Sequence, residues 1–91
     1  MRIISQDGTL DVPYENVVLY QERKEIMCIF SGIYIGEKIA QYSTEEKAQK
    51  AMEMLREKYK DYAKATNKSN FFTMFDYPKV FQFQKDEDVE V

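Results

Sequence analysis

The pattern of apolar and polar residues near the start of the chain predicts a β-hairpin. Short apolar stretches flank the pair Asp7-Gly8. An Asp-Gly pair in this position favours a tight type I′ turn, because that turn needs positive φ angles. The arms are expected at 2–6 and 9–13, and Pro13 is expected to end the second arm or to place it at a sheet edge.

The next stretch of the chain predicts three antiparallel strands. β-branched and aromatic residues fill two runs of strand length, at 16–20 and 25–30, and the charged segment 21–24 lies between them. A third strand is expected over 33–42, so that residues 16–42 form a meander with short turns. Alternation places Ile33, Ile35 and Ile39 on one face of the third strand, and Tyr34, Lys38, Ala40 and Tyr42 on the other.

The longest periodic segment predicts an α-helix from about 44 to 64. Its apolar residues recur with the spacing of one helix face. Ser43 and Glu46 have the spacing of a capping box, in which each side chain bonds the other residue's backbone amide. Acidic residues in the first turn also suit the helix dipole. The apolar positions are 48, 51, 52, 55, 59 and 62.

Aromatic residues are concentrated after this helix. The polar segment 66–70 is expected to end the helix, and four aromatic residues then fall within 71–77. After Pro78, the alternation at 80–84 predicts a half-buried strand. The remaining residues, about 85–91, form an acidic tail.

These elements predict an α+β fold in a single domain, residues 1–91, because a chain of this length is too short to divide. We expect an antiparallel β-sheet of four to six strands with the amphipathic helix, about 44–64, packed on one face. The N-terminal hairpin and the strand near 79–84 should extend that sheet. One helix covers only one face, so the other face is expected to be exposed, partly covered by 65–78, or buried in a homodimer.

The composition argues against most kinds of catalysis. The chain has no His, which removes the commonest general base and a common metal ligand. Its one Cys, Cys28, lies in an apolar run, where a buried structural role is favoured over a reactive thiol. Turn chemistry and solvated charge explain Asp7, Asp11 and Glu15 better than an active site of paired carboxylates does. The acidic stretch 86–90 lacks the Gly and the spacing of an EF-hand loop. We therefore expect no enzyme activity, no catalytic residue, no metal and no cofactor.

The sequence carries no signal for export or for membrane insertion. Its N-terminus has no apolar signal region, and its longest apolar run is far shorter than a membrane span. A single free Cys fits a reducing compartment. We expect a cytoplasmic protein without a membrane partner.

The net charge of −3 is unevenly distributed along the chain. Residues 1–43 carry a net charge of −2, residues 44–68 a net charge of +2, and residues 69–91 a net charge of −3. The basic excess lies on the predicted helix, but acidic residues share its polar face. Mixed charges of this kind are typical of a solvated face rather than a phosphate-binding track, so direct nucleic-acid binding is not expected.

The aromatic segment and the acidic tail together form the candidate binding region. The aromatic residues follow no clean period, so they either plug the end of the sheet against the helix or form an exposed patch typical of protein interfaces. An acidic tail beside such a patch would suit a basic partner, although it also serves solubility. The candidate contact residues are Phe71, Phe72, Tyr77, Asp86, Glu87 and Asp88.

Three segments carry a resemblance that spans most of the chain: MRIISQDGTLDVPYE at 1–15, YSTEEKA at 42–48 and VFQF at 80–83. They resemble small proteins carried on mobile elements and prophages of Gram-positive bacteria. Small, acidic, single-domain proteins of such elements include anti-CRISPR proteins, which block a host defence nuclease. By analogy of size, charge and setting, the resemblance implies a bacterial host and a host protein as partner.

Two hypotheses about function follow. The first is a non-enzymatic protein-binding inhibitor from a phage or mobile element, in its specific form an anti-CRISPR protein that occludes a type II CRISPR effector nuclease. The alternative is a homodimeric structural or regulatory accessory protein of the element, without inhibitor activity, that associates through the uncovered sheet face. A third reading, a carboxylate-based enzyme, would need a cleft with two close acids.

Overall fold

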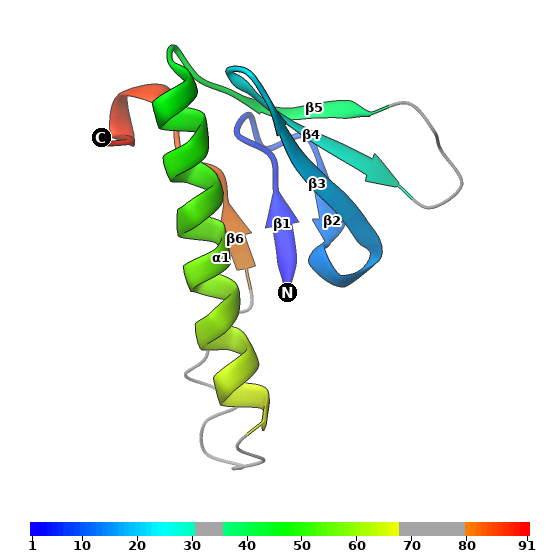
Figure 1. The fold of residues 1–91 in the computed structure, drawn as a ribbon. Helices are drawn as coiled ribbons and strands as arrows, with labels where there is room; N and C mark the ends of the chain where they lie inside the picture. Colours follow the sequence, from blue (N-terminus) through cyan, green and yellow to red (C-terminus); the bar gives the residue numbers. More distant parts are fainter. Residues whose placement is uncertain (31–35, 68–79) are drawn as a thin grey trace.

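The computed structural model describes residues 1–30, 36–67 and 80–91, with the side chains of 65–67 excepted (Figure 1). This part of the chain contains six strands and one α-helix, and short 3₁₀ turns lie at Tyr14–Asn16 and Asp86–Asp88. The strands and the helix are β1 (Arg2–Ile4), β2 (Asp11–Pro13), β3 (Val17–Glu22), β4 (Glu25–Phe30), β5 (Glu37–Gln41), α1 (Glu45–Asn67) and β6 (Val80–Gln82). The predicted α+β class is confirmed.

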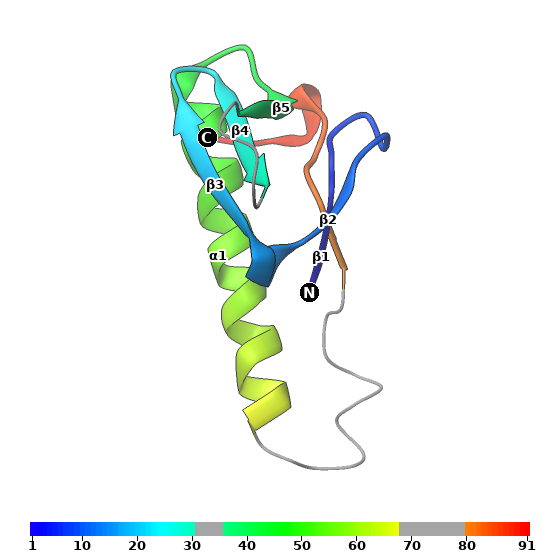
Figure 2. The ribbon, with the colours of Figure 1, turned by 90° about the vertical axis from the view of Figure 1, so that its right-hand side faces the viewer.

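The strands form two sheets rather than one extended sheet. The first sheet has the order β2-β1-β6 and the second the order β3-β4-β5. Figure 2 shows the second sheet in front of α1 and the first sheet to its right. The expectation that the hairpin and the last strand extend the meander is therefore wrong. The 3₁₀ turn at Tyr14–Asn16 redirects the chain after β2, and Tyr14 fixes that turn by packing on Tyr59 of α1 with ring centroids 4.4 Å apart.

The predicted N-terminal hairpin is present, but its turn differs from the expected one. β1 and β2 pair antiparallel, and Pro13 is the last residue of edge strand β2, as predicted. The amide of Gly8 donates to the carbonyl of Ser5 at 3.0 Å, and Gly8 has a φ of 80°. Asp7 is not in the positive-φ region that a type I′ turn centred on Asp7-Gly8 requires. The amide of Ser5 donates to the carbonyl of Leu10 at 2.8 Å, so the loop between these two residues is longer than a two-residue turn.

The predicted meander is confirmed for the described residues, in which the third strand is β5 (Glu37–Gln41). Ile33, Tyr34 and Ile35 of the predicted strand 33–42 lie outside the described residues. A bulge explains the one departure from alternation. β3 and β4 pair without interruption and are joined by the two residues Arg23-Lys24. Between β4 and β5 the register shifts, so that Ile26 pairs with Ala40 while Met27 pairs with Lys38. Ile39 is the extra residue, and both Ile39 and Ala40 are buried. Strict alternation had placed these two residues on opposite faces, and the bulge brings both into the core.

The helix α1 matches the predicted periodic segment, although its cap lies one residue later than expected. The amide of Lys47 donates to Oγ1 of Thr44 at 3.1 Å, which makes Thr44 the N-cap residue. Ser43, the predicted cap, instead donates its amide to Oδ1 of Asp86 at 2.7 Å. The capping box with Glu46 is therefore absent. A contact from the far end of the chain determines which of two adjacent hydroxyl residues caps the helix.

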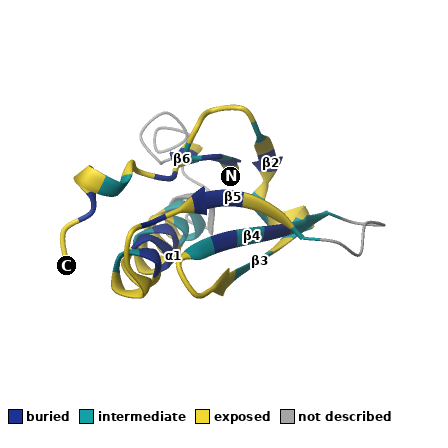
Figure 3. Cartoon of the chain, turned by 90° about the horizontal axis from the view of Figure 1, so that it is seen from above, coloured by how far each residue is buried: buried dark blue, intermediate teal, exposed yellow. Residues whose placement is uncertain are grey.

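The core is a single apolar cluster between α1 and the two sheets, seen as the dark blue segments in Figure 3. The predicted pair Phe81 and Phe83 is buried there, with the rings edge to face and 5.2 Å apart. All four apolar positions in the first part of the predicted helix face are buried as well. The cluster consists of Met1, Ile3, Val12, Ile26, Cys28, Ile39, Ala40, Tyr42, Ala48, Ala51, Met52, Leu55, Phe81, Phe83 and Val89.

Gln6 joins the two sheets at the edge of β5. Its amide donates to the carbonyl of Ile39 at 2.9 Å, and its Oε1 accepts from the amide of Gln41 at 3.0 Å. Its Nε2 donates to the carbonyl of Gln84 at 3.0 Å, just beyond β6. One residue of the hairpin loop therefore binds the outer edge of β5 much as a neighbouring strand would.

Within the described residues, no helix has both the length and the apolar character that crossing a membrane requires.

Candidate functional site

Asp7 is a structural residue of the hairpin loop. Its Oδ1 accepts hydrogen bonds from the hydroxyls of Ser5 and Thr9, both at 2.7 Å, and from the amide of Thr9 at 3.0 Å. The bond from Ser5 is the largest cause of a pKa lowered to about 2, and the bonds from Thr9 add to it. Because these donors hold the carboxylate ionised, Asp7 is a poor general acid and a weak base near neutral pH.

The other two acidic residues of this region have partners of their own. Arg2 donates to both carboxylate oxygens of Asp11, and this hydrogen bonding lowers the pKa of Asp11. Glu15 accepts from the amino group of Met1 at 2.7 and 3.0 Å. Asp7, Asp11 and Glu15 are therefore divided among three separate structural contacts, which is the turn and surface role that the sequence favoured.

Neither Cys28 nor Tyr42 has the properties of a catalytic group. Cys28 is fully buried, and desolvation, with a further contribution from the charge of Glu37, raises the pKa of its thiol. The hydroxyl of Tyr42 donates to the carbonyl of Gln84 at 2.9 Å, and burial raises the pKa of Tyr42 to about 12. Both groups are therefore neutral at physiological pH, whereas a nucleophile has to reach its anionic form.

No metal centre is formed by the described residues, since no three of their Cys, Asp and Glu side chains gather closely enough to hold an ion.

The six predicted contact residues are only partly covered by the structure. Phe71, Phe72 and Tyr77 lie outside the described residues. All residues of the acidic tail, 85–91, lie within the described part of the chain. Its three predicted residues, Asp86, Glu87 and Asp88, form a 3₁₀ turn beside the first turns of α1 (Figure 1).

Asp86 anchors the tail to the rest of the fold. Its carboxylate accepts from the amide of Ser43 at 2.7 Å and lies 3.5 Å from Nζ of Lys47. The hydrogen bond from the Ser43 amide is the largest cause of the lowered pKa of Asp86. Lys47 also donates to the carbonyl of Asp86 at 2.9 Å, and Val89 is buried with 3% of its surface exposed. Asp86 therefore holds the tail in place, while 37% of its side-chain surface stays exposed.

The remaining tail carboxylates belong to a larger acidic surface that includes α1. Glu90 lines a shallow depression together with Glu46 and Glu53 of the helix, where Lys50 is the one cation among the lining residues. Glu87 and Asp88 are exposed on the adjoining 3₁₀ turn. We call this surface the acidic end, and it comprises Glu46, Glu53, Glu87, Asp88 and Glu90. The sequence singled out only two of its five residues, because Glu46, Glu53 and Glu90 meet only once the tail is docked.

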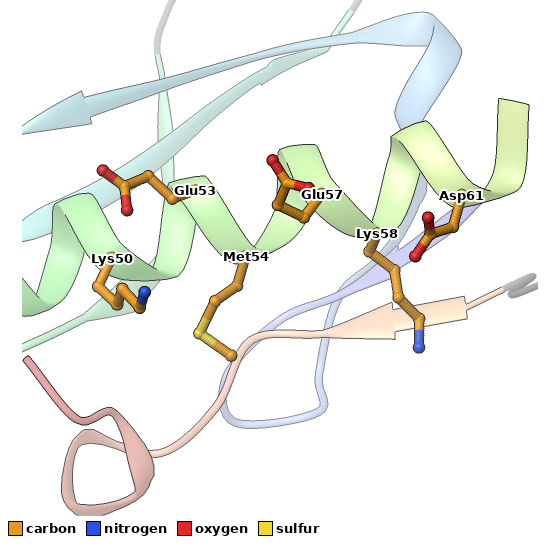
Figure 4. A pocket seen from close by; sticks show the side chains of 6 residues that line it. All are labelled: Lys50, Glu53, Met54, Glu57, Lys58 and Asp61. Atoms are coloured by element: carbon orange, nitrogen blue, oxygen red, sulfur yellow. The ribbon is translucent and has the colours of Figure 1, made fainter.

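The polar face of α1 beyond the acidic end is of mixed charge. A shallow depression along three turns of the helix has Met54 in its middle (Figure 4). Lys60 is paired with Glu57 at 3.3 Å. Alternating signs of this kind match the solvated face that the sequence predicted and do not form a continuous cationic track. The depression is lined by Lys50, Glu53, Met54, Glu57, Lys58 and Asp61.

A second candidate surface is the face of the second sheet that points away from the core. Val18 lies opposite Ile29 and Tyr20 lies opposite Met27, so these four side chains share one face. None of the four belongs to the core cluster or packs against it, and Val18 is 58% exposed. In the view from above in Figure 3, no other described segment crosses β3, β4 and β5. We call Val18, Tyr20, Met27 and Ile29 the outer face.

Comparison of the chain with protein-family models, with curated proteins and with solved structures gave no match. The two surfaces therefore have to be interpreted from their own chemistry.

Proposed function

We propose that this chain is a non-enzymatic protein-binding inhibitor, and that its acidic end occupies a basic, nucleic-acid-binding site on a host protein. The specific form of the proposal is an anti-CRISPR protein of a phage or mobile element that occludes a type II CRISPR effector nuclease. The resemblance of the sequence suggests the setting, and the geometry of the acidic end supports the mode of binding.

The observation that carries the proposal is the docking of the tail through Asp86 and Val89. A flexible acidic tail would lose conformational entropy on binding, and that loss would weaken the complex. Here Asp86 and buried Val89 hold the tail in place before any partner arrives. Glu90 then lies beside Glu46 and Glu53, and exposed Glu87 and Asp88 lie on the adjoining 3₁₀ turn. A preorganised group of negative charges is complementary to a groove that binds phosphates.

The described acidic residues support binding better than catalysis. Asp7 and Asp11 are held ionised by hydrogen-bond donors, and Cys28 is buried as a neutral thiol. The acidic end is open and shallow, whereas an active site for acid–base chemistry usually has an enclosed, partly apolar pocket. Its chemistry is that of a charged contact surface.

The proposal is tested by mixing the purified protein with a guide-loaded type II effector before target DNA is added. We expect cleavage to be blocked at near-equal stoichiometry and the block to weaken as salt is raised, because surface charge interactions are screened. Full cleavage at large molar excess, with effectors of several subtypes, would contradict the proposal.

A matched pair of charge reversals locates the contact. The double variant Glu87→Lys/Asp88→Lys changes two exposed residues of the acidic end and should lose inhibition. The control Glu57→Lys/Asp61→Lys makes the same change of net charge on the exposed helix face farther along α1. Equal loss of inhibition in both variants would assign the effect to overall charge and overturn the assignment to the acidic end.

The alternative function, a homodimeric structural or regulatory protein of the element, is favoured by a different observation, the outer face, which no other described segment crosses. Apolar residues on two adjacent strands, with Val18 mostly exposed, are typical of a surface that another protein covers. Sedimentation tests this alternative. A dimer that persists on dilution and leaves nuclease activity untouched would favour it over the inhibitor.

A further inference from the structure

Within the described residues, the second sheet has one covered edge and one open edge. The edge strand β5 is bound by Gln6 through a backbone and a side-chain hydrogen bond. The other edge strand, β3, pairs only with β4 within the described residues. β3 is six residues long, whereas the edge strands β2 and β6 of the first sheet have three residues each.

The hairpin geometry determines which backbone groups of β3 point outward. The two-residue turn makes Glu22 and Glu25 a directly opposed pair, and the residues that flank such a turn are hydrogen-bonded to each other. The hydrogen-bonded pairs then alternate along the ladder, so that Tyr20 and Val18 bond to β4. The amides and carbonyls of Val17, Leu19 and Gln21 therefore face away from β4. The bond from the amide of Tyr42 to the carbonyl of Lys24, on the β5 side of the hairpin, agrees with this alternation.

β3 also lacks the features that usually prevent edge-to-edge pairing. It contains no Pro and no Lys, and its register with β4 is free of bulges. Its sequence, Val-Val-Leu-Tyr-Gln-Glu, is rich in residues that favour strands. An exposed edge of this kind is a template for another strand.

We propose that β3 pairs antiparallel with β3 of a second copy of this chain, about a two-fold axis at Leu19, so that two three-stranded sheets become one sheet of six strands. In this register, Val17 lies opposite Gln21 of the second copy and Leu19 lies opposite Leu19. All three outward-facing residues then find partners, which adds about six backbone hydrogen bonds across the interface.

The symmetry of the strand favours a second copy over an unrelated strand. A two-fold interface requires a strand that is complementary to itself, and a two-fold axis at Leu19 meets this requirement through the side chains that it brings together. The same register places Val18 next to Tyr20 of the second copy, which covers the most exposed residue of the outer face. Glu22 comes opposite Asn16, so no like charges face each other along the paired strands.

This pairing is independent of the inhibitor proposal, because β3 and the acidic end do not share a residue. Either proposal can fail while the other holds, and separate measurements decide them.

The test uses a proline that the monomer should tolerate. The amide of Gln21 points outward and its side chain is exposed, so Gln21→Pro leaves the bonds between β3 and β4 in place and blocks pairing with a second copy. Gln21→Ala is the matched control, since it removes the same side-chain hydrogen bonds to the carbonyls of Arg23 and Glu45 and keeps the outward amide. We expect sedimentation of the natural sequence and of Gln21→Ala to show a dimer at high concentration, and Gln21→Pro to be monomeric with an unchanged circular dichroism spectrum.

Hydrogen exchange of the unsubstituted protein gives a second readout that does not depend on the folding of any variant. The amides of Val17, Leu19 and Gln21 should become at least tenfold better protected as the concentration rises from micromolar to near-millimolar. The amides of Val18 and Tyr20 should be protected at all concentrations. A monomer over this whole range, or a dimer that Gln21→Pro leaves intact, overturns the proposal.

Discussion

Gln6 shows how much one side chain contributes to this fold. Its backbone and both ends of its side-chain amide are bonded, to Ile39, Gln41 and Gln84. Nothing in the sequence marked the residue, because a polar side chain beside Asp7-Gly8 is ordinary in a turn. Its role depends on the two sheets meeting at β5, which only the folded chain creates.

We predict that Gln6→Ala lowers the free energy of unfolding by about 1 kcal/mol, because the amide of Gln41 loses its acceptor and the carbonyl of Gln84 keeps only the hydrogen bond from the hydroxyl of Tyr42. Urea denaturation measures the change. Gln49→Ala, at an exposed helix position, is the control and should stay within about 0.5 kcal/mol of the natural sequence. Equal stability of the two variants would show that Gln6 does not join the sheets.

Asp7 predicts a specific dependence of stability on pH. Its folded-state pKa of about 2 lies below the ordinary value of 3.8, so the carboxylate stabilises the folded state above pH 3.8. That contribution is lost as the pH falls from 3.8 to about 2, because the unfolded chain takes up the proton first.

The measurement is the urea midpoint of unfolding at successive pH values through that window. Asp7→Asn retains the hydrogen-bonding shape of the side chain and removes the titrating group, so its midpoint should depend less steeply on pH. Parallel pH profiles for the two proteins would show that the bonds from Ser5 and Thr9 do not lower the pKa of Asp7.

At the scale of elements, local patterns predicted the helix and the meander but not their boundaries with the rest of the fold. The apolar positions of α1 recur within the chain itself, so the helix is legible from sequence. The separation into two sheets cannot be predicted from local patterns, because it depends on the 3₁₀ turn that Tyr14 holds by packing on Tyr59. The bulge at Ile39 likewise arises from pairing with β4. The alternation of residues along one strand gives no information about its register with a neighbouring strand.

The helix cap provides a test at this scale. We predict that Thr44→Ala lowers the free energy of unfolding by about 0.5–2 kcal/mol, because the amide of Lys47 loses its acceptor. Ser43→Ala should cost less, since the Ser43 amide still donates to Asp86. Thermal and urea denaturation of both variants show which substitution lowers the free energy of unfolding more. A larger decrease for Ser43→Ala would indicate that Ser43, the cap predicted from the sequence, caps the helix.

At the scale of the whole molecule, docking of the tail brings acidic residues from separate parts of the chain onto one surface. The sequence predicted a short acidic tail that either contacts a basic partner or serves solubility, and three of its residues were named as candidate contacts. The structure makes Asp86 an internal anchor and leaves Glu87 and Asp88 outside. Glu46 and Glu53 join the surface although they lie more than thirty residues away along the chain. A site assembled from two distant parts of a sequence cannot be found from local spacing alone.

That β3 is the open edge of its sheet within the described residues could not be predicted from the sequence, for a similar reason. The strand itself was predicted, and the sheet face opposite the helix was expected to be exposed, partly covered by 65–78, or buried in a homodimer. Whether β3 or β5 would remain open depends on Gln6, which binds the edge of β5 from the other sheet. Sheet order is a property of the assembled chain, and strand propensity does not determine it.

The most direct test of the central claim, that the acidic end occupies a nucleic-acid-binding site, is competition for that site. Fluorescence anisotropy of labelled target DNA would be followed on a guide-loaded, cleavage-inactive type II effector while this protein is titrated. The account predicts that the DNA is displaced as the protein approaches equal stoichiometry, and that Glu87→Lys/Asp88→Lys displaces it at least tenfold less effectively than Glu57→Lys/Asp61→Lys does. DNA that stays bound at large excess of the protein would contradict the account.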